Sequence, residues 1–150
     1  MIKVSVAIPQ EEVAIDRGCM RHIVRTVLEG EGIANAEISL AFVDNATSQR
    51  LNKRYLDHDE PTDILTFPLS EAGGKLTGEL VVGAEVAQVQ AQERGHDVQV
   101  ELALYVIHGL LHLCGFNDKS ADQAAQMRQH ERHYLGILGL PDISEKETGT

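Results

Sequence analysis

The amino-acid sequence predicts an α+β fold in which a mixed sheet of about four strands packs against helices, one of them central and buried. Segments that resemble strands are interspersed with segments of helical periodicity, and helices cluster toward the C-terminal end. The most apolar stretch, residues 96–113, carries apolar side chains at almost every angle, which is typical of a helix inside a domain. The length suits a single domain over residues 1–150, with a polar tail from about residue 143.

The strands are predicted from short apolar or alternating runs. Residues 2–8 alternate apolar and polar side chains, as a half-buried strand does. Residues 63–67 follow one proline and precede another, which favours a short strand. The predicted strands are residues 2–8, 37–43, 63–67 and 78–83.

The helices are predicted from periodicity and from residues that begin or end a helix. Asp44 or Asn45 can cap the second helix, and Ser120 with Gln123 forms a capping box before the last one. Gly115 can take the left-handed conformation that ends a helix. The predicted helices are residues 12–31, 46–55, 84–93, 96–113 and 121–138, with a turn at Gly73-Gly74.

Charge and composition exclude several classes of protein. The net charge of −10 argues against a protein that coats nucleic acid by charge alone. No apolar run reaches the roughly 20 residues that span a bilayer, and the N-terminus lacks a secretory signal, so we expect a cytoplasmic protein without membrane contact. The two cysteines, Cys19 and Cys114, are expected to be free thiols.

The segment from His108 to Asp118 predicts a metal site. Histidines at i and i+4 lie about 40° apart around a helix axis, so His108 and His112 can face one ion. Gly115 can end the helix and let the chain bring Asp118 back to the same ion. Two histidines and a carboxylate leave one zinc position open, as in catalytic sites, and these ligands also suit Ni²⁺.

Other residues near this motif have alternative interpretations. Glu101 and Tyr105 fall on about the same helix face as the histidines, so they are either outer partners of the ligands or residues at the solvent edge of the helix. His130 and His133 favour a solvated face over a second metal site. Cys114 is an unfavoured ligand because it lies about 120° away from His108 around the helix.

Three segments resemble a known family. His108 to Asp118 resembles the H-G-x-L-H-L-x-G-Y-D-H signature of the YbeY family of bacterial endoribonucleases. Residues 51–68, with Leu-Asn, Tyr and Asp-Glu-Pro-Thr-Asp-Ile-Leu-Thr-Phe-Pro, and residues 78–81, Gly-Glu-Leu-Val, are similar to two further family segments in the same order. The resemblance implies a zinc hydrolase fold, cleavage of single-stranded RNA, and a role in 16S rRNA 3′-end processing and ribosome quality control. It implies rRNA, the 30S subunit and ribosomal proteins as partners.

The sequence departs from the family pattern at two positions. Asp118 stands where the family has its third histidine, so the zinc site would carry a formal charge of about +1 instead of about +2 and acidify water less. Leu56 stands where the family usually has an arginine near the phosphate, and Arg54 is a weak substitute. The resemblance also makes Thr62 and Asp63 candidates for lining the substrate groove, although both can equally cap a turn.

Three functions follow from these observations. The first is a zinc-dependent endoribonuclease that uses His108, His112 and Asp118. The second is a non-catalytic, metal-stabilised module that binds the ribosome during assembly, which Leu56 and the acidic charge favour. The third is a zinc peptidase, which Gly109 disfavours because it replaces the glutamate that follows the first histidine in such enzymes.

Overall fold

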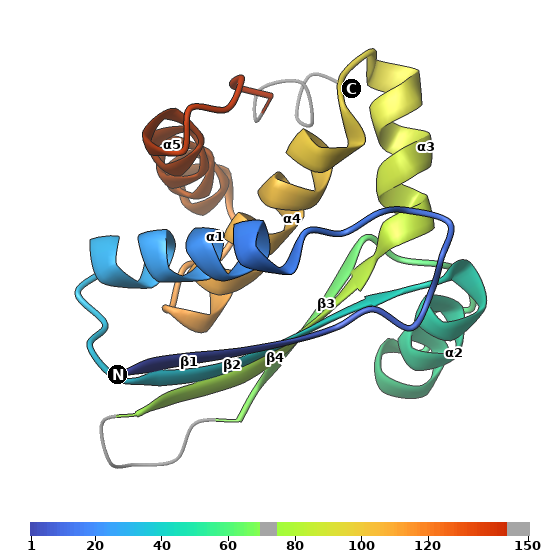
Figure 1. Cartoon of the computed structure of the whole chain (residues 1–150), viewed down its shortest axis with the longest axis horizontal. Helices are drawn as coiled ribbons and strands as arrows, with labels where there is room; N and C mark the ends of the chain where they lie inside the picture. The colour runs from blue at the N-terminus through green and yellow to red at the C-terminus, as the bar shows by residue number, and fades with distance from the viewer. Residues whose placement is uncertain (70–74, 144–150) are drawn as a thin grey trace.

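The computed structural model describes residues 1–69 and 75–143, which form a four-stranded sheet and five helices (Figure 1). The α+β prediction is confirmed. The strands are β1 (Ile2–Ala7), β2 (Ala36–Val43), β3 (Ile64–Pro68) and β4 (Leu76–Gly83). The helices are α1 (Arg17–Gly30), α2 (Asn45–Leu56), α3 (Ala84–Arg94), α4 (Val98–Leu113) and α5 (Ala121–Ile137).

The sheet is mixed, and its short strand β3 forms one edge. The order is β1-β2-β4-β3, with β1, β2 and β4 parallel and β3 antiparallel to β4. Ile64 pairs with Val82 and Pro68 with Gly78, so β3 covers only the end of β4 nearest α3 and the middle of that strand. The other side of β3 therefore has no strand partner among the described residues.

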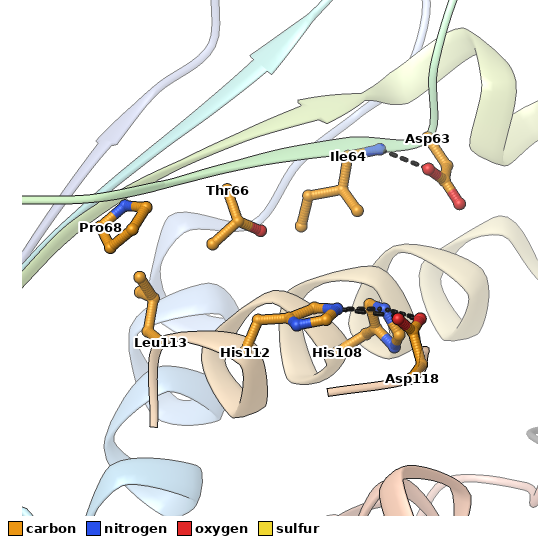
Figure 2. Close-up of a pocket in the computed structure, with 8 residues that line it drawn as sticks. All are labelled: Asp63, Ile64, Thr66, Pro68, His108, His112, Leu113 and Asp118. Atoms are coloured by element: carbon orange, nitrogen blue, oxygen red, sulfur yellow. Dashed lines mark hydrogen bonds and ion pairs between the residues drawn. The ribbon is translucent and has the colours of Figure 1, made fainter. Parts of the chain in front are cut away.

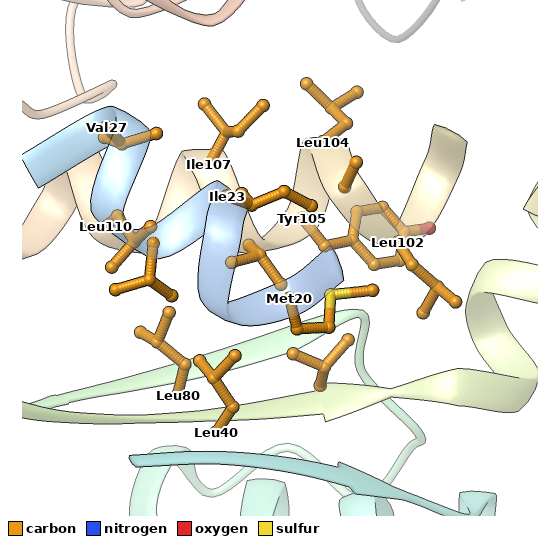
Figure 3. Packing of buried hydrophobic residues seen from close by; sticks show 14 of the residues in the cluster. Met20, Ile23, Val27, Leu40, Leu80, Leu102, Leu104, Tyr105, Ile107 and Leu110 are labelled. Atoms are coloured by element: carbon orange, nitrogen blue, oxygen red, sulfur yellow. The ribbon is translucent and has the colours of Figure 1, made fainter. Parts of the chain in front are cut away.

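The main core lies between one face of the sheet and helices α1, α4 and α5. Figure 3 shows Met20, Ile23 and Val27 of α1 meeting Leu40 and Leu80 of the sheet beside α4. Eleven of the sixteen residues of α4 are buried, so this helix is the central buried helix that the sequence predicts. Helix α2 packs on the opposite face of the sheet, against a much smaller cluster around Val43, Leu65 and Val81.

Glycine allows α4 to approach the sheet closely. A Cβ at Gly109 would lie 2.6 Å from Ile64 Cδ1 and 2.9 Å from Leu80 Cδ2. A Cβ at Gly78 would lie 2.6 Å from Leu113 Cδ1. The end of α4 that carries the two histidines is therefore held directly against β3 and β4.

Two predicted boundaries are wrong. Helix α1 begins at Arg17 instead of residue 12, because Asp16 caps it by accepting a hydrogen bond from Cys19 N. Val13 reaches the core from the preceding loop, which the side chain of Gln10 closes by hydrogen bonds to both backbone groups of Val13. Ile143, taken as the start of a polar tail, is buried in the main core because its side chain is apolar.

The remaining boundaries agree to within about two residues, the usual uncertainty of helix ends. Asp44, rather than Asn45, caps α2 by accepting from Thr47 N at 2.8 Å. The capping box of Ser120 and Gln123 is confirmed. The predicted turn at Gly73-Gly74 and the tail over residues 144–150 lie outside the described residues. In the described part of the chain, no helix combines the length and apolarity needed to cross a membrane.

Candidate metal centre

The last two turns of α4 present His108 and His112 to one pocket. Their Nε2 atoms lie 3.1 Å apart, and their ring centroids 4.7 Å apart. Both rings are partly exposed, at 25% and 26%, although most of α4 is buried. The i, i+4 spacing therefore places two imidazole nitrogens beside each other at the surface end of a buried helix, as the sequence predicts.

The chain reversal after α4 brings Asp118 to the histidines. Gly115 has a φ of 104°, and Phe116 N donates to Leu111 O while Gly115 N donates to His112 O. These two bonds with a left-handed glycine form a Schellman motif, which ends the helix and turns the chain. Asp118 Oδ2 then lies 3.5 Å from His108 Nε2 and 3.8 Å from His112 Nε2.

The three side chains fit a zinc ion. Their ligand atoms all lie within 4.8 Å of one another, and the three separations are 3.1, 3.5 and 3.8 Å. Tetrahedral zinc with bonds of about 2.0–2.2 Å places neighbouring ligand atoms about 3.4 Å apart. The observed separations lie on both sides of that value, so small side-chain adjustments complete the geometry.

His108, His112 and Asp118, called the metal group below, form part of an open pocket of about 490 Å³ between α4 and β3 (Figure 2). Alternate residues of β3 form one wall. No lysine or arginine of the described chain lines this pocket, whereas two carboxylates do. Without a cation the pocket is therefore electrostatically unfavourable for a phosphate group. The lining residues are Asp63, Ile64, Thr66, Pro68, His108, His112, Leu113 and Asp118.

A buried glutamate on α5 orients His108. Glu131 Oε2 lies 2.6 Å from His108 Nδ1, and Glu131 is only 3% exposed. With Nδ1–H donating to this carboxylate, the Nε2 lone pair faces Asp118 and His112. Glu131 was not predicted. Its helical spacing could have indicated that it is buried, because this spacing places a glutamate within an apolar stripe. The other buried residues of α5 are Met127, Tyr134 and Leu135.

The two histidines have different affinities for protons. Burial lowers the pKa of His108, but the hydrogen bond and charge of Glu131, with the charges of Asp118 and Asp63, outweigh it, so the pKa is raised. Burial lowers the pKa of His112, and the neighbouring His108 lowers it further. In the metal-free protein His108 is therefore the histidine that takes up a proton first as the pH falls.

Of the two groove candidates, Asp63 lines the pocket and Thr62 does not. Asp63 lines it across from the histidines, while its Oδ1 accepts from Ile64 N at 2.7 Å and from Thr62 Oγ1 at 3.3 Å. Asp63 thus both caps the start of β3 and faces the pocket. Thr62 supports Asp63 but is not part of the lining.

Two further candidates lie away from the pocket lining. Arg54 sits over the ring of Tyr55 on α2, with its Cζ 5.4 Å from the ring centroid. Leu56, at the end of the same helix, is exposed. Neither residue lines the metal pocket, so α2 supplies no positively charged side chain to a phosphate bound there.

Both interpretations of Glu101 are wrong. Its side chain is fully buried at the start of α4, where Arg94 Nη1 lies 3.1 Å from Oε1 and His96 Nε2 hydrogen-bonds Oε2. It therefore neither reaches the metal group nor faces solvent, because α3 and the loop before α4 cover that end of the helix. Tyr105 is also buried, in the main core.

The less favoured ligands stay outside the metal group. Cys114 is half-buried, and burial raises the pKa of its thiol to about 11, which disfavours a thiolate ligand. His130 packs its ring against Phe116, with centroids 4.2 Å apart. His133 is exposed on α5. Among the described residues, the group of potential ligands is His108, His112 and Asp118.

Comparisons with known proteins show which family the chain is similar to. The model of the family described as endoribonuclease YbeY matches residues 5–139. A protein of that name from Pelotomaculum thermopropionicum is 38% identical over 142 residues, which cover 87% of this chain and 93% of that protein. One from Sulfurovum sp. is 40% identical over 117 residues, covering 74% and 78%. The solution structure of TM1509 from Thermotoga maritima matches with a TM-score of 0.61 and 26% identity over 91% of each chain.

Proposed function

The chain belongs to the endoribonuclease YbeY family, and on that premise we propose that it is a zinc-dependent endoribonuclease that cleaves single-stranded RNA. We further propose that it acts in the cytoplasm on the 3′ end of 16S rRNA and in ribosome quality control, with the 30S subunit and ribosomal proteins as partners. The observation that supports this proposal best is the group of His108, His112 and Asp118 at coordination distance in an open pocket.

The residues of the pocket have separate roles in this proposal. Zinc held by His108, His112 and Asp118 would supply a Lewis acid that polarises a phosphoryl oxygen or activates water. Glu131 keeps the Nδ1 proton of His108 in place, so that Nε2 stays available as a ligand. Asp63, across the pocket, is the carboxylate that we assign to accept the proton of the nucleophile.

Electrostatics make the cation essential for substrate binding in this proposal. The carboxylates of Asp63 and Asp118 face the space that a phosphodiester would occupy, and the lining has no basic side chain. A divalent ion offsets these two charges, and the phosphodiester then meets a neutral rather than a repulsive pocket. Metal removal should therefore weaken RNA binding at the pocket as well as cleavage.

The peptidase alternative has less support. A side chain at Gly109, where a zinc peptidase keeps its glutamate, would collide with Ile64 and Leu80. Residue 109 thus faces the sheet instead of the pocket. The position has no room for a general base, and its glycine has a packing role.

The binding-module alternative is favoured by one observation. Leu56 replaces the family's arginine, and the described lining of the pocket contains no other cation that could take its place. This alternative predicts co-sedimentation with ribosomal subunits and no cleavage by the zinc-loaded protein. Turnover of RNA by the purified protein would exclude it.

The experiment is an RNA cleavage assay on purified protein. The zinc-loaded protein should cut a single-stranded fragment that carries the 16S rRNA 3′ region, and chelator should stop the reaction. His112→Ala should lose bound zinc and cleavage together. His22→Ala, which changes an exposed histidine on α1, serves as the matched control and should retain both. Cleavage by a metal-free His112→Ala protein would contradict the proposed mechanism.

A further inference from the structure

A second groove lies on the side of β3 that faces away from the metal pocket. It has a volume of about 320 Å³ and is mostly apolar. Helix α2 packs on this face of the sheet (Figure 1). The groove is lined by Leu51, Tyr55, Phe67, Leu69, Glu79 and Val81.

The two cavities share one strand. Ile64, Thr66 and Pro68 of β3 line the metal pocket, whereas Phe67 and the following Leu69 line the groove. Successive side chains of a strand point to opposite faces, so the cavities lie back to back across β3. Because β3 is an edge strand, a flexible chain that enters the metal pocket has only to cross this edge to reach the groove.

The groove carries an exposed aromatic ring. Tyr55 is 54% exposed, and its ring meets Phe67 edge-on with centroids 5.1 Å apart. The guanidinium of Arg54 lies over the same tyrosine ring, and Arg50 and Lys53 are on the same helix. Lys53 pairs with Asp59 at 3.7 Å, so Arg54 is the cation that the structure places directly beside the aromatic ring of the groove. This combination suits a nucleobase and its phosphate.

The free edge of β3 is poorly suited to pairing with a polypeptide strand. Asp63 O accepts from Gly83 N and Leu69 N donates to Thr77 O, so residues 64, 66 and 68 direct their backbone groups outward. Ile64 N is already bonded to the Asp63 side chain, and Pro68 has no N–H. Among the described residues, only the N–H of Thr66 points outward from β3 without a hydrogen-bond acceptor. A peptide would therefore gain little from strand addition here.

We propose that this groove is a nucleobase-binding subsite, in which a base of a single-stranded RNA stacks on Tyr55 while the backbone crosses the edge of β3 to the metal pocket. The inference rests on the proposed function for the identity of the ligand. Arg54 attracts the adjacent phosphate, and the Glu79 carboxylate accepts from an exocyclic amino group such as that of cytosine. An apolar side chain of a protein partner could not form a hydrogen bond with Glu79, so this residue favours a nucleobase as the ligand.

The test is the affinity of the zinc-loaded protein for labelled hexacytidine, measured by fluorescence anisotropy with the RNA checked for integrity. Tyr55→Ala should weaken binding by roughly 5- to 150-fold, the effect of losing one base–aromatic stack. Tyr55→Phe should retain most of the affinity. Val89→Ala, at another exposed apolar position, should bind like the parent protein. Tyr55 is exposed, so these variants leave the core intact.

A matched ligand separates stacking from charge. An abasic oligonucleotide with the same number of phosphates should bind the parent and Tyr55→Ala equally, whereas Arg54→Ala should weaken both ligands and reduce the salt dependence of binding. Equal affinity of the parent and Tyr55→Ala for hexacytidine would overturn the subsite and leave the groove to an apolar segment of a protein. If binding depends on Tyr55 but the RNA is not cleaved, the subsite stands and the nuclease proposal fails. If the RNA is cleaved but binding does not depend on Tyr55, the nuclease proposal stands and the subsite fails.

Discussion

Helix α4 has a histidine–glutamate pair at each end, and the two pairs are built for different purposes. At its N-terminal end, His96 hydrogen-bonds Glu101, which also pairs with Arg94, and the side chains of His96 and Glu101 are 9% and 0% exposed. At its C-terminal end, His108 pairs with buried Glu131, but its ring remains 25% exposed beside His112 and Asp118. No arginine neutralises the second glutamate in the described structure.

The same residue types thus occur in a structural cluster at one end and in a cluster that remains open to a ligand at the other. The charge of Arg94 offsets that of Glu101, so the buried carboxylate of the first pair is neutralised without any ligand. At the second pair, Nε2 of His108 and the carboxylate of Asp118 face the open pocket, where a divalent cation would complete the group. Stability and metal affinity therefore distinguish the two ends of α4 experimentally.

The largest effect on stability is expected at the N-terminal end. Arg94→Met should destabilise the fold by on the order of 3 kcal/mol, because it leaves the buried charge of Glu101 without its main partner. Urea unfolding monitored by circular dichroism measures the change. Lys75→Met, which breaks an exposed pair with Glu37, is the control and should leave the stability close to that of the parent protein. Equal losses in the two variants would show that the Glu101 cluster is not structural.

Zinc should stabilise only a protein whose C-terminal end is intact. At free zinc about 100-fold above Kd, binding should add about 2.7 kcal/mol to the stability and raise Tm. Chelator should reverse the gain. His108→Ala should abolish the zinc-dependent increment, whereas His96→Gln should preserve it even if its starting stability is lower. A zinc-dependent gain of the same size in His108→Ala would place the ion elsewhere.

A smaller effect is expected from the partner of His108. Glu131→Gln should weaken zinc affinity by about 10- to 100-fold, because the amide loses the charge that orients and polarises the imidazole. A competition titration with a chromophoric chelator measures the affinity. Glu93→Gln, on the exposed surface of α3, should have no effect. Unchanged affinity in Glu131→Gln would remove this residue from the site.

The pH dependence of zinc binding follows from the raised pKa of His108. Protonated imidazole cannot coordinate, so affinity should be constant above this pKa and fall by about tenfold per pH unit below it. Because the pKa is raised, the fall begins at a higher pH than for an ordinary histidine with a pKa of about 6.5. Glu131→Gln should move the onset to lower pH. Isothermal titration across the pH range measures it, and an onset unchanged by Glu131→Gln would contradict the assignment.

Local patterns in the sequence were sufficient to predict most of the fold. The apolar periodicity of α4, the capping box before α5 and Gly115 after α4 are signals that reside in neighbouring residues, and each is confirmed. The same signals placed His108, His112 and Asp118 together. The start of α1 was missed because Val13 has the periodicity of a helix although it reaches the core from a loop.

Features that depend on contacts distant in sequence were not predictable in this way. Glu131 meets His108 across 23 positions, and its neighbours in α5 are so polar that the region resembles a solvated face. The pairing of Glu101 depends on how α3 packs against α4, which a helical projection of one segment does not contain. The alternation of β3 between two cavities likewise requires its place at the sheet edge.

The zinc content of the purified protein beside Asp118→Ala, determined by elemental analysis after loading and desalting, tests the metal site most directly. We expect one zinc per chain, held at the end of α4, and loss of most of it when Asp118 loses its carboxylate. A protein that takes up no zinc after loading, or an Asp118→Ala variant that retains a full equivalent, would contradict it.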